Sequence, residues 1–274
     1  MRSASQIRDP AGMGGKAGDM QLRILGCSGG IGSGAKTTAI LIDRDILIDS
    51  GTGVGDLSLA ELRAIRHVFL THSHLDHIAG FPLFLDSVFD SCADRPIQVH
   101  ARQETISALE QHIFNWVIWP DFTKLPEADA PVMQYSPIDP GDVVTLGDRR
   151  VQAIEVCHAV PSLGFCIARG NDVVAISGDT AANETLWPAL NAHANLNALI
   201  VEVSFANSQE ELARISGHYC PRTLAQDIRR LEHAPAVWVT AMKPAYEELI
   251  FDEVVDALQG YEVQRLRAGD VLDL

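Results

Sequence analysis

Short apolar runs bounded by Gly, Asp, Ser and Asn recur along the chain, and this pattern predicts β-strands joined by turns. In the first half, strands are predicted at 22–27, 38–43, 46–49, 67–70 and 97–100. Apolar residues at helical spacing predict helices at 59–65, which Ser58 caps, and at 78–90 and 102–115.

The second half repeats this order after residues 120–140, which contain five prolines and are predicted to form an irregular connection. Strands are predicted at 143–146, 150–156, 164–168, 173–177, 198–203, 236–240, 262–266 and 271–274, and helices at 183–192, 209–215, 222–232 and 245–258. Two similar halves of this kind predict an α+β fold, in which two sheets pack face to face and helices cover the outer faces.

Composition favours one large domain. The chain has 274 residues, 47% of them hydrophobic, which suffices for a sizeable core, and no break in composition divides it. We therefore expect a single domain at 21–274. Residues 1–20 are rich in glycine and lack the apolar segment of a secretory signal, so they are predicted to be a disordered tail.

The net charge restricts which substrates are expected, and the cysteine content indicates the cellular compartment. Lys and Arg total 21 against 36 Asp and Glu, a formal net charge of −15, and no basic stripe is present. Because long nucleic acids require such a stripe, a phosphate substrate is expected to be small. The 5 cysteines are scattered, which favours reduced thiols in the cytoplasm. No apolar run reaches the length of a membrane span, so no membrane partner is expected.

The run Thr71–His77 contains three histidines and one aspartate, and it directly follows the predicted strand 67–70. His72 and His74 are two residues apart, so they share one side of an extended backbone and can bind one ion. Asp76 and His77 follow as the chain turns into a helix, which directs them toward a second ion. Imidazole and carboxylate ligands suit Zn²⁺, or the similar ions Mn²⁺ and Fe. The alternative is a polar turn in which histidines gather by chance.

Three further side chains stand at or just past the ends of predicted strands. His158 can give the first ion a third nitrogen, and Asp179 can bridge both ions, although an ordinary turn histidine and a helix cap are the alternatives. Asp49 either accepts a hydrogen bond from the histidine cluster or is a simple turn residue.

A separate apolar stretch, residues 114–119, is unusual for a surface segment. Such a patch is typical of a core or a subunit interface, which leads us to expect a homodimer. A contact between a nucleobase and Trp116 or Trp119 is the less favoured interpretation.

The run Thr-His-Ser-His-Leu-Asp-His at 71–77 resembles the HxHxDH signature of the metallo-β-lactamase superfamily. With Ile78 it is similar to the motif of class II 3′,5′-cyclic-nucleotide phosphodiesterases. The resemblance extends over 22–274, and Asp49, His158 and Asp179 follow in the order of the superfamily's other motifs. It implies a four-layer αββα sandwich, two divalent metal ions and hydrolysis of phosphodiesters. The ligands would be His72, His74, Asp76, His77, His158 and Asp179.

One position departs from that pattern. The superfamily has a metal-binding histidine after a late strand, where this chain has Ala241 in the run Ala241-Met242-Lys243-Pro244. The second ion is therefore expected to bind more weakly or to be completed by water. By the same resemblance, His218 is assigned as a proton donor or phosphate contact, and Asp76 is expected to orient the nucleophile as well as bind metal.

The sequence thus predicts a phosphodiesterase that converts cyclic AMP or cyclic GMP to 5′-nucleotides through a metal-bound hydroxide. One alternative is an RNA 3′-end-processing endonuclease of the tRNase Z type, which the acidic composition disfavours. Another is a metal-binding protein with impaired catalysis, which Ala241 favours. Thioester or lactone hydrolysis is a further possibility, since the metal cluster does not encode the substrate.

Overall fold

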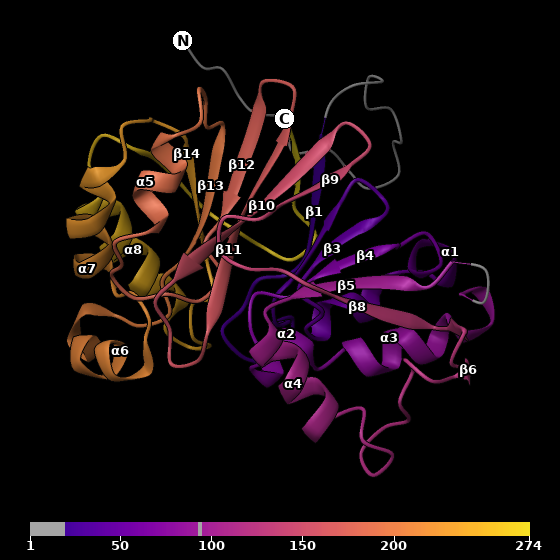
Figure 1. Cartoon of the computed structure of the whole chain (residues 1–274). Coiled ribbons are helices and arrows are strands. Elements are labelled where there is room, and N and C mark those ends of the chain that lie inside the picture. Colours follow the sequence, from indigo (N-terminus) through magenta and orange to yellow (C-terminus); the bar gives the residue numbers. More distant parts are fainter. Residues whose placement is uncertain (1–19, 93–94) are drawn as a thin grey trace.

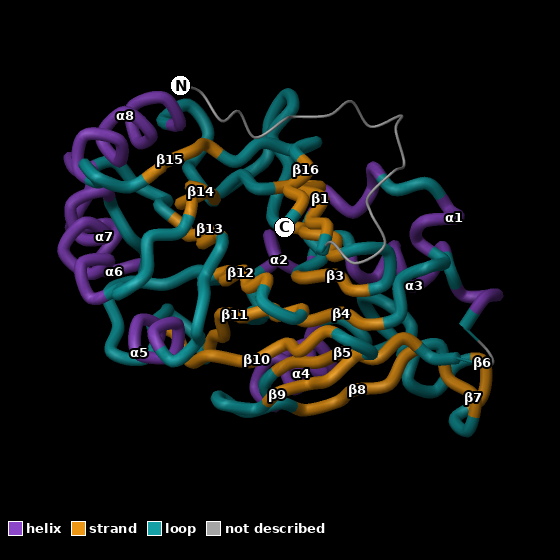
Figure 2. The backbone as a smooth tube through the Cα atoms, turned by 90° about the horizontal axis from the view of Figure 1, so that it is seen from above, coloured by secondary structure: helices purple, strands orange, loops and turns teal. Residues whose placement is uncertain are grey.

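The fold is described by a computed structural model that covers residues 20–92 and 95–274. Two seven-stranded mixed sheets pack face to face, and helices lie on both outer faces (Figures 1 and 2). This is the four-layer α+β sandwich that the sequence predicts. Of the predicted tail at 1–20, residues 1–19 lie outside the described residues. The prediction was wrong for Met20, which is buried and whose backbone pairs with Leu274 through hydrogen bonds of 3.1 and 2.9 Å that extend the pairing of β1 with the last strand.

Each sheet draws its strands from one half of the chain, except that the last strand in sequence joins the first sheet. In spatial order, the first sheet contains β16 (Val271–Asp273), β1 (Gln21–Gly26), β2 (Ala39–Ile42), β3 (Ile46–Ile48), β4 (His67–Phe69), β5 (Ile97–Ala101) and β8 (Met133–Pro137). The second contains β15 (Glu262–Arg265), β14 (Ala236–Thr240), β13 (Ala198–Glu202), β12 (Asp172–Ile176), β11 (Ser162–Arg169), β10 (Arg149–Val156) and β9 (Val143–Leu146). A small separate ribbon pairs β6 (Pro126–Glu127) with β7 (Ala130–Pro131).

Helices follow the same division. Those of the first half are α1 (Leu59–Leu62), α2 (Leu75–Ile78), α3 (Phe81–Ser87) and α4 (Gln103–His112), with 3₁₀ turns η1 (Thr52–Asp56) and η2 (Phe89–Ser91). Those of the second half are α5 (Leu186–Asn191), α6 (Glu210–Ser216), α7 (Pro221–Asp227) and α8 (Glu247–Ala257), with η3 (Asn207–Gln209) and η4 (Ile228–Arg230).

The central strands are apolar on both faces, which explains their continuous hydrophobic runs. In β2, Ile40 and Ile42 pack between the two sheets, whereas Leu41 faces the helices of the first half. Likewise in β13, Ile200 faces the other sheet and Leu199 faces the helices of the second half. This alternation fixes which side chains meet in the middle layer and holds the two sheets together.

Two predictions differ from the structure. Strands β6, β7 and β8 lie inside the connection predicted to be irregular at 120–140, and β8 pairs in parallel with β5. It was not predicted because only Met133 and Tyr135 give it an apolar alternation. The helix predicted at 78–90 begins earlier, at Leu75, and is divided at Gly80. A Cβ at Gly80 would lie 2.3 Å from Val54 Cγ1, so α2 and α3 pack closely over η1 only because that position has no side chain.

The apolar stretch at 114–119 divides between core and surface. Phe114 is buried and Trp119 packs against the core of the first half, whereas Trp116, Val117 and Ile118 are exposed. The exposed part is compatible with a subunit interface, and the homodimer stays a prediction. Within residues 20–92 and 95–274, no helix combines the length and the apolar character that crossing a bilayer requires.

An ion-pair network joins the two sheets at the β2–β3 turn. Arg149 on β10 donates to both carboxylate oxygens of Asp45, at 2.6 and 2.8 Å, and to Asp43 at 3.0 Å. Arg169 on β11 donates to Asp43 at 2.6 Å. Burial by itself raises the pKa of Asp45, but the Arg149 guanidinium outweighs burial and lowers that pKa.

We predict that Arg149→Ala lowers the free energy of unfolding by about 2 kcal/mol at pH 7, because it leaves Asp45 without its bidentate partner and Asp43 with Arg169 as its remaining partner. A carboxylate with a lowered pKa stabilises the fold above its unfolded pKa, about 3.9, and this contribution is lost as the pH falls. The difference between the two proteins should therefore shrink below about pH 4. Urea unfolding at several pH values measures it. Exposed Arg150 provides the control Arg150→Ala, and equal losses in both variants would contradict the prediction.

Candidate metal centre

The predicted ligands follow strands of both sheets and lie close together between the two halves of the molecule. In the first sheet, β3, β4 and β5 are parallel, so Asp49 and the Thr71–His77 run leave the sheet on the same side. In the second sheet, His158 follows β10 and Asp179 follows β12. Residues more than a hundred positions apart in sequence are thereby brought together.

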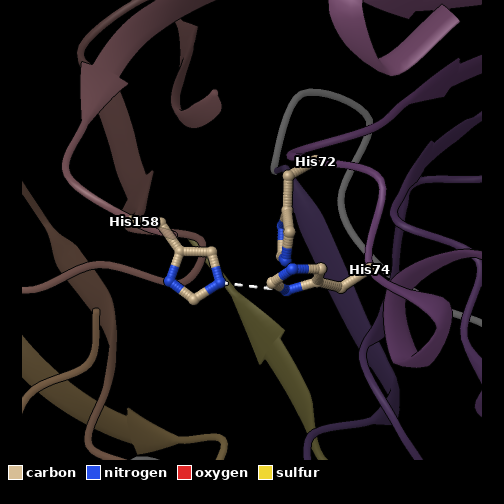
Figure 3. Close-up of side chains that lie close together, drawn as sticks. All are labelled: His72, His74 and His158. Atoms are coloured by element: carbon tan, nitrogen blue, oxygen red, sulfur yellow. Dashed lines mark hydrogen bonds between the residues drawn. The ribbon is translucent and has the colours of Figure 1, made fainter. Parts of the chain in front are cut away.

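His72, His74 and His158 form the first group of donors. Each offers a ring nitrogen, and these atoms lie within 4.8 Å of one another. Figure 3 shows His158 facing the other two rings from the opposite half of the molecule, with its Nε2 3.0 Å from His74 Nδ1. Three imidazoles at these separations surround a space in which one ion could contact all of them.

The second group consists of His72, His77 and Asp179, whose ligand atoms also lie within 4.8 Å of one another. Asp179 Oδ2 is 3.3 Å from His77 Nε2 and 3.9 Å from His72 Nε2. It is also 4.0 Å from His158 Nε2, so this carboxylate adjoins both groups. Asp76 lies beside them, with Oδ2 3.9 Å from His77 Nε2 and a side chain that is 35% exposed.

The donor atoms fit a divalent ion because one of them has no other partner. His72 is fully buried, yet its Nε2 makes no hydrogen bond within the described residues. Burial lowers the pKa of His72 well below its ordinary value, with His77 adding to the effect. Burial likewise lowers the pKa of His74 and of His158. Neutral imidazoles carry the lone pair that a metal requires, so divalent metal binding accounts for this group.

Asp49 supports the cluster from beneath. Its Oδ2 accepts a hydrogen bond of 2.6 Å from His77 Nδ1, which leaves Nε2 of that ring directed at Asp179. It also accepts from the Thr71 amide and hydroxyl, both at 2.8 Å. Of the two sequence interpretations, the structure thus favours the acceptor that orients a ligand over the simple turn residue.

His77 and Asp179 are a buried pair in which each group shifts the pKa of the other toward its charged form. Burial alone lowers the pKa of His77, but the carboxylates of Asp179 and Asp49 outweigh burial and raise it well above its ordinary value. Burial alone raises the pKa of Asp179, but the adjacent His77 outweighs burial and holds that pKa well below its usual range. Without an ion, a proton on His77 thus offsets the buried negative charge.

His218 lies beside this cluster on the connection between α6 and α7. Its Nδ1 donates to Glu202 Oε1 at 2.9 Å and lies 4.0 Å from Asp179 Oδ2. Together with His158 and Asp179 it forms a third group of donors within 4.8 Å, so its position permits metal contact as well as the predicted role in proton donation.

Glu202 is a site residue that the sequence analysis did not assign. It is 1% exposed and accepts hydrogen bonds from His218, from the Thr180 and Tyr219 amides and from the Ser204 hydroxyl. The available signal was a single carboxylate at the end of an otherwise apolar strand. Such a group requires several donors, and His218 is one of them.

Ala241 lies next to the same network. It is 4% exposed, and its carbonyl accepts a hydrogen bond of 3.1 Å from Ser204 Oγ. Its backbone has a φ of 61°, in the left-handed region that histidine tolerates better than most residues. The methyl group offers no ligand, as the sequence predicts. The roles of individual residues as metal ligands stay predictions.

A family model described as "Beta-lactamase superfamily domain" matches residues 44–239. A probable 3′,5′-cyclic-nucleotide phosphodiesterase of Yersinia pestis is 25% identical over 210 residues, which cover 68% of this chain and 59% of that protein. A 3′,5′-cyclic-nucleotide phosphodiesterase of Aliivibrio fischeri is 27% identical over 261 residues, covering 79% and 77%. A ribonuclease Z of Haloarcula marismortui is 24% identical over 302 residues, covering 88% and 93%.

Solved structures show the same fold. Unliganded yeast PDE1 superimposes with a TM-score of 0.77 at 19% identity, covering 93% of this chain and 99% of that one. The metallo-β-lactamase fold protein YhfI of Bacillus subtilis gives a TM-score of 0.75 at 17% identity, with the same coverage of 93% and 99%.

We predict that Asp49→Asn weakens metal binding about 10- to 100-fold, because an amide is a poorer acceptor for the His77 Nδ1–H and its NH₂ group opposes that proton. Competition with a chromogenic chelator measures the affinity. Asp56→Asn is the control, since Asp56 is an exposed residue that pairs with Lys36. An unchanged affinity in a folded Asp49→Asn protein would show that Asp49 does not orient a ligand.

Proposed function

The chain belongs to the β-lactamase superfamily, and we propose that it is a metal-dependent phosphodiesterase that hydrolyses 3′,5′-cyclic nucleotides to 5′-nucleotides. The observation that carries this proposal is the convergence of two groups of donors, which share His72, at one sheet edge beside the hydrogen-bonded pair His218–Glu202. Metal ligands and a positioned proton donor are the parts that phosphodiester hydrolysis requires.

We infer the substrate from the names of the relatives and from the net charge of the chain. Two relatives bear the name cyclic-nucleotide phosphodiesterase, and this chain spans 59% and 77% of their lengths. The net charge of −15 disfavours a long polyanion and is compatible with a small substrate whose phosphate is held by metal ions. For the ions we propose Zn²⁺, because imidazole and carboxylate donors suit it, with Mn²⁺ and Fe as alternatives. All five cysteines are free, which fits a cytoplasmic enzyme.

Divalent ions, when bound at this centre, supply a Lewis acid for the phosphoryl oxygens and lower the pKa of water to about 7. The chain's own residues orient the reacting groups. Asp76, which is partly exposed at the edge of the cluster, would accept a hydrogen bond from the attacking water. Because Glu202 accepts the proton on His218 Nδ1, the Nε2 atom remains to donate a proton to the departing 3′-oxygen.

Ribonuclease Z activity is the alternative within the same family. It is favoured by the Haloarcula relative, 93% of whose length this chain covers. A second alternative is a metal-binding protein with impaired catalysis, which the missing donor at Ala241 favours. Hydrolysis of cyclic nucleotides and of a precursor tRNA, measured side by side, separates these three.

We predict that the protein hydrolyses cyclic AMP or cyclic GMP when Mn²⁺ or Zn²⁺ is added, and that Ala241→His lowers the metal concentration needed for half-maximal rate about tenfold, roughly the value of one added imidazole ligand. Chromatography of the released 5′-nucleotide measures the rate. Ala268→His, at an exposed loop position, is the control. If neither the protein as it stands nor the Ala241→His variant turns over a cyclic nucleotide, the phosphodiesterase assignment is wrong.

A further inference from the structure

A groove of about 620 Å³ opens beside the metal centre and is not accounted for by the donors described above. It is lined by the turn after β10, residues 157–162, by residues 182–185 before α5, and by Arg102 from the other half of the molecule. His158 belongs both to this lining and to the first group of donors. The groove and the candidate metal site are therefore continuous.

Arg102 reaches the groove because of the parallel pairing of β4 with β5. Phe69 is in register with His100, and the Leu70 amide donates to the His100 carbonyl at 2.9 Å. Arg102 follows two residues after His100, so it leaves the sheet at the same edge as His72. Ligands of sheets with parallel strands commonly bind outside the carboxyl ends of those strands.

The groove holds little net charge. The Arg102 guanidinium lies 3.3 Å from Glu155 through Nη1 and 3.4 Å from Glu104 through Nε. Glu184, the other acid in the lining, pairs with Arg230 at 2.7 Å. The remaining lining combines the apolar side chains of Val156, Val160 and Pro161 with neutral polar ones such as Asn183 and Thr185. A site with a neutralised cation, apolar surface and uncharged hydrogen-bonding groups suits a heteroaromatic ring better than it suits a phosphate.

Arg102 is held in place at the wall of the groove. Its guanidinium is paired with Glu104 and Glu155, and its side chain is 18% exposed. A guanidinium held in place by two carboxylates is a planar group on which a heteroaromatic base can stack and to which it can hydrogen-bond. The volume of the groove lies within the range of small-molecule sites, about 300–1,000 Å³.

We propose that this groove binds the nucleoside part of a cyclic nucleotide while the phosphate lies at the metal centre, and that Arg102 is a specificity-determining residue for the base. The inference rests on the proposed function, since it assigns one end of the substrate. It explains why a groove of this size, lined by both halves of the fold, shares a histidine with the metal cluster.

The test compares a substrate with a nucleoside and one without. For Arg102→Ala and for Ala182→Trp, which fills the groove from an exposed position, we expect kcat/KM for the cyclic nucleotide to fall about tenfold or more, mainly through KM. The rate with bis(p-nitrophenyl) phosphate, a phosphodiester without a nucleoside, should change less than twofold. Ala268→Trp, at an exposed alanine that is not in the groove lining, is the matched control.

A binding measurement separates failure of this inference from failure of the proposed function. Calorimetry should show that the metal-loaded protein binds 5′-AMP at least tenfold more tightly than inorganic phosphate, and that Ala182→Trp removes this preference. If the protein hydrolyses cyclic nucleotides but both groove variants leave KM and the preference for 5′-AMP unchanged, the groove assignment is wrong and the phosphodiesterase proposal stands. If the protein prefers 5′-AMP and Ala182→Trp removes this preference, but no phosphodiester is hydrolysed, the groove assignment stands and the phosphodiesterase proposal is wrong. If 5′-AMP and phosphate bind equally, the groove assignment fails.

Discussion

The structure depends on the burial of imidazoles and a carboxylate at one edge of the sandwich, where one of their ligand atoms has no hydrogen-bond partner in the described residues. His72 Nε2 has no hydrogen-bond partner within the described residues, and Asp179 is nearly buried against three histidines. Leaving one buried polar group unpaired costs about 1–3 kcal/mol. Divalent cations bound between these atoms would coordinate His72 Nε2 and offset the charge of Asp179.

The sandwich creates this arrangement through its strand ends. Apolar residues on both faces of the central strands leave the carboxyl ends as the places where polar side chains can gather. Because the two sheets pack face to face, His158 and Asp179 from one half come to lie against His72 and His74 from the other. Rigid strands fix these positions, whereas the loops beyond them, including residues 157–162 and 182–185, shape the adjoining groove.

Much of this could be predicted from the sequence because the signals are local. The alternation of apolar runs identified most strands, and the spacing of His72, His74 and His77 identified the cluster. Strand β8 was not identified, because Gln134 and Ser136 are polar and Pro137 ends the strand, so its pairing with β5 depends on a neighbour that the local pattern does not specify. Glu202 was also missed, because its role arises from a contact with His218, 16 residues away, that no local spacing encodes.

The central claim is that the histidine cluster binds divalent metal directly, and X-ray absorption spectroscopy of the zinc-loaded protein tests it most directly. The account predicts scattering from several imidazole rings with Zn–N distances of about 2.0–2.1 Å, and a marked loss of this imidazole signal in His74→Ala protein. A spectrum that shows only oxygen ligands, or one that His74→Ala leaves unchanged, would contradict it.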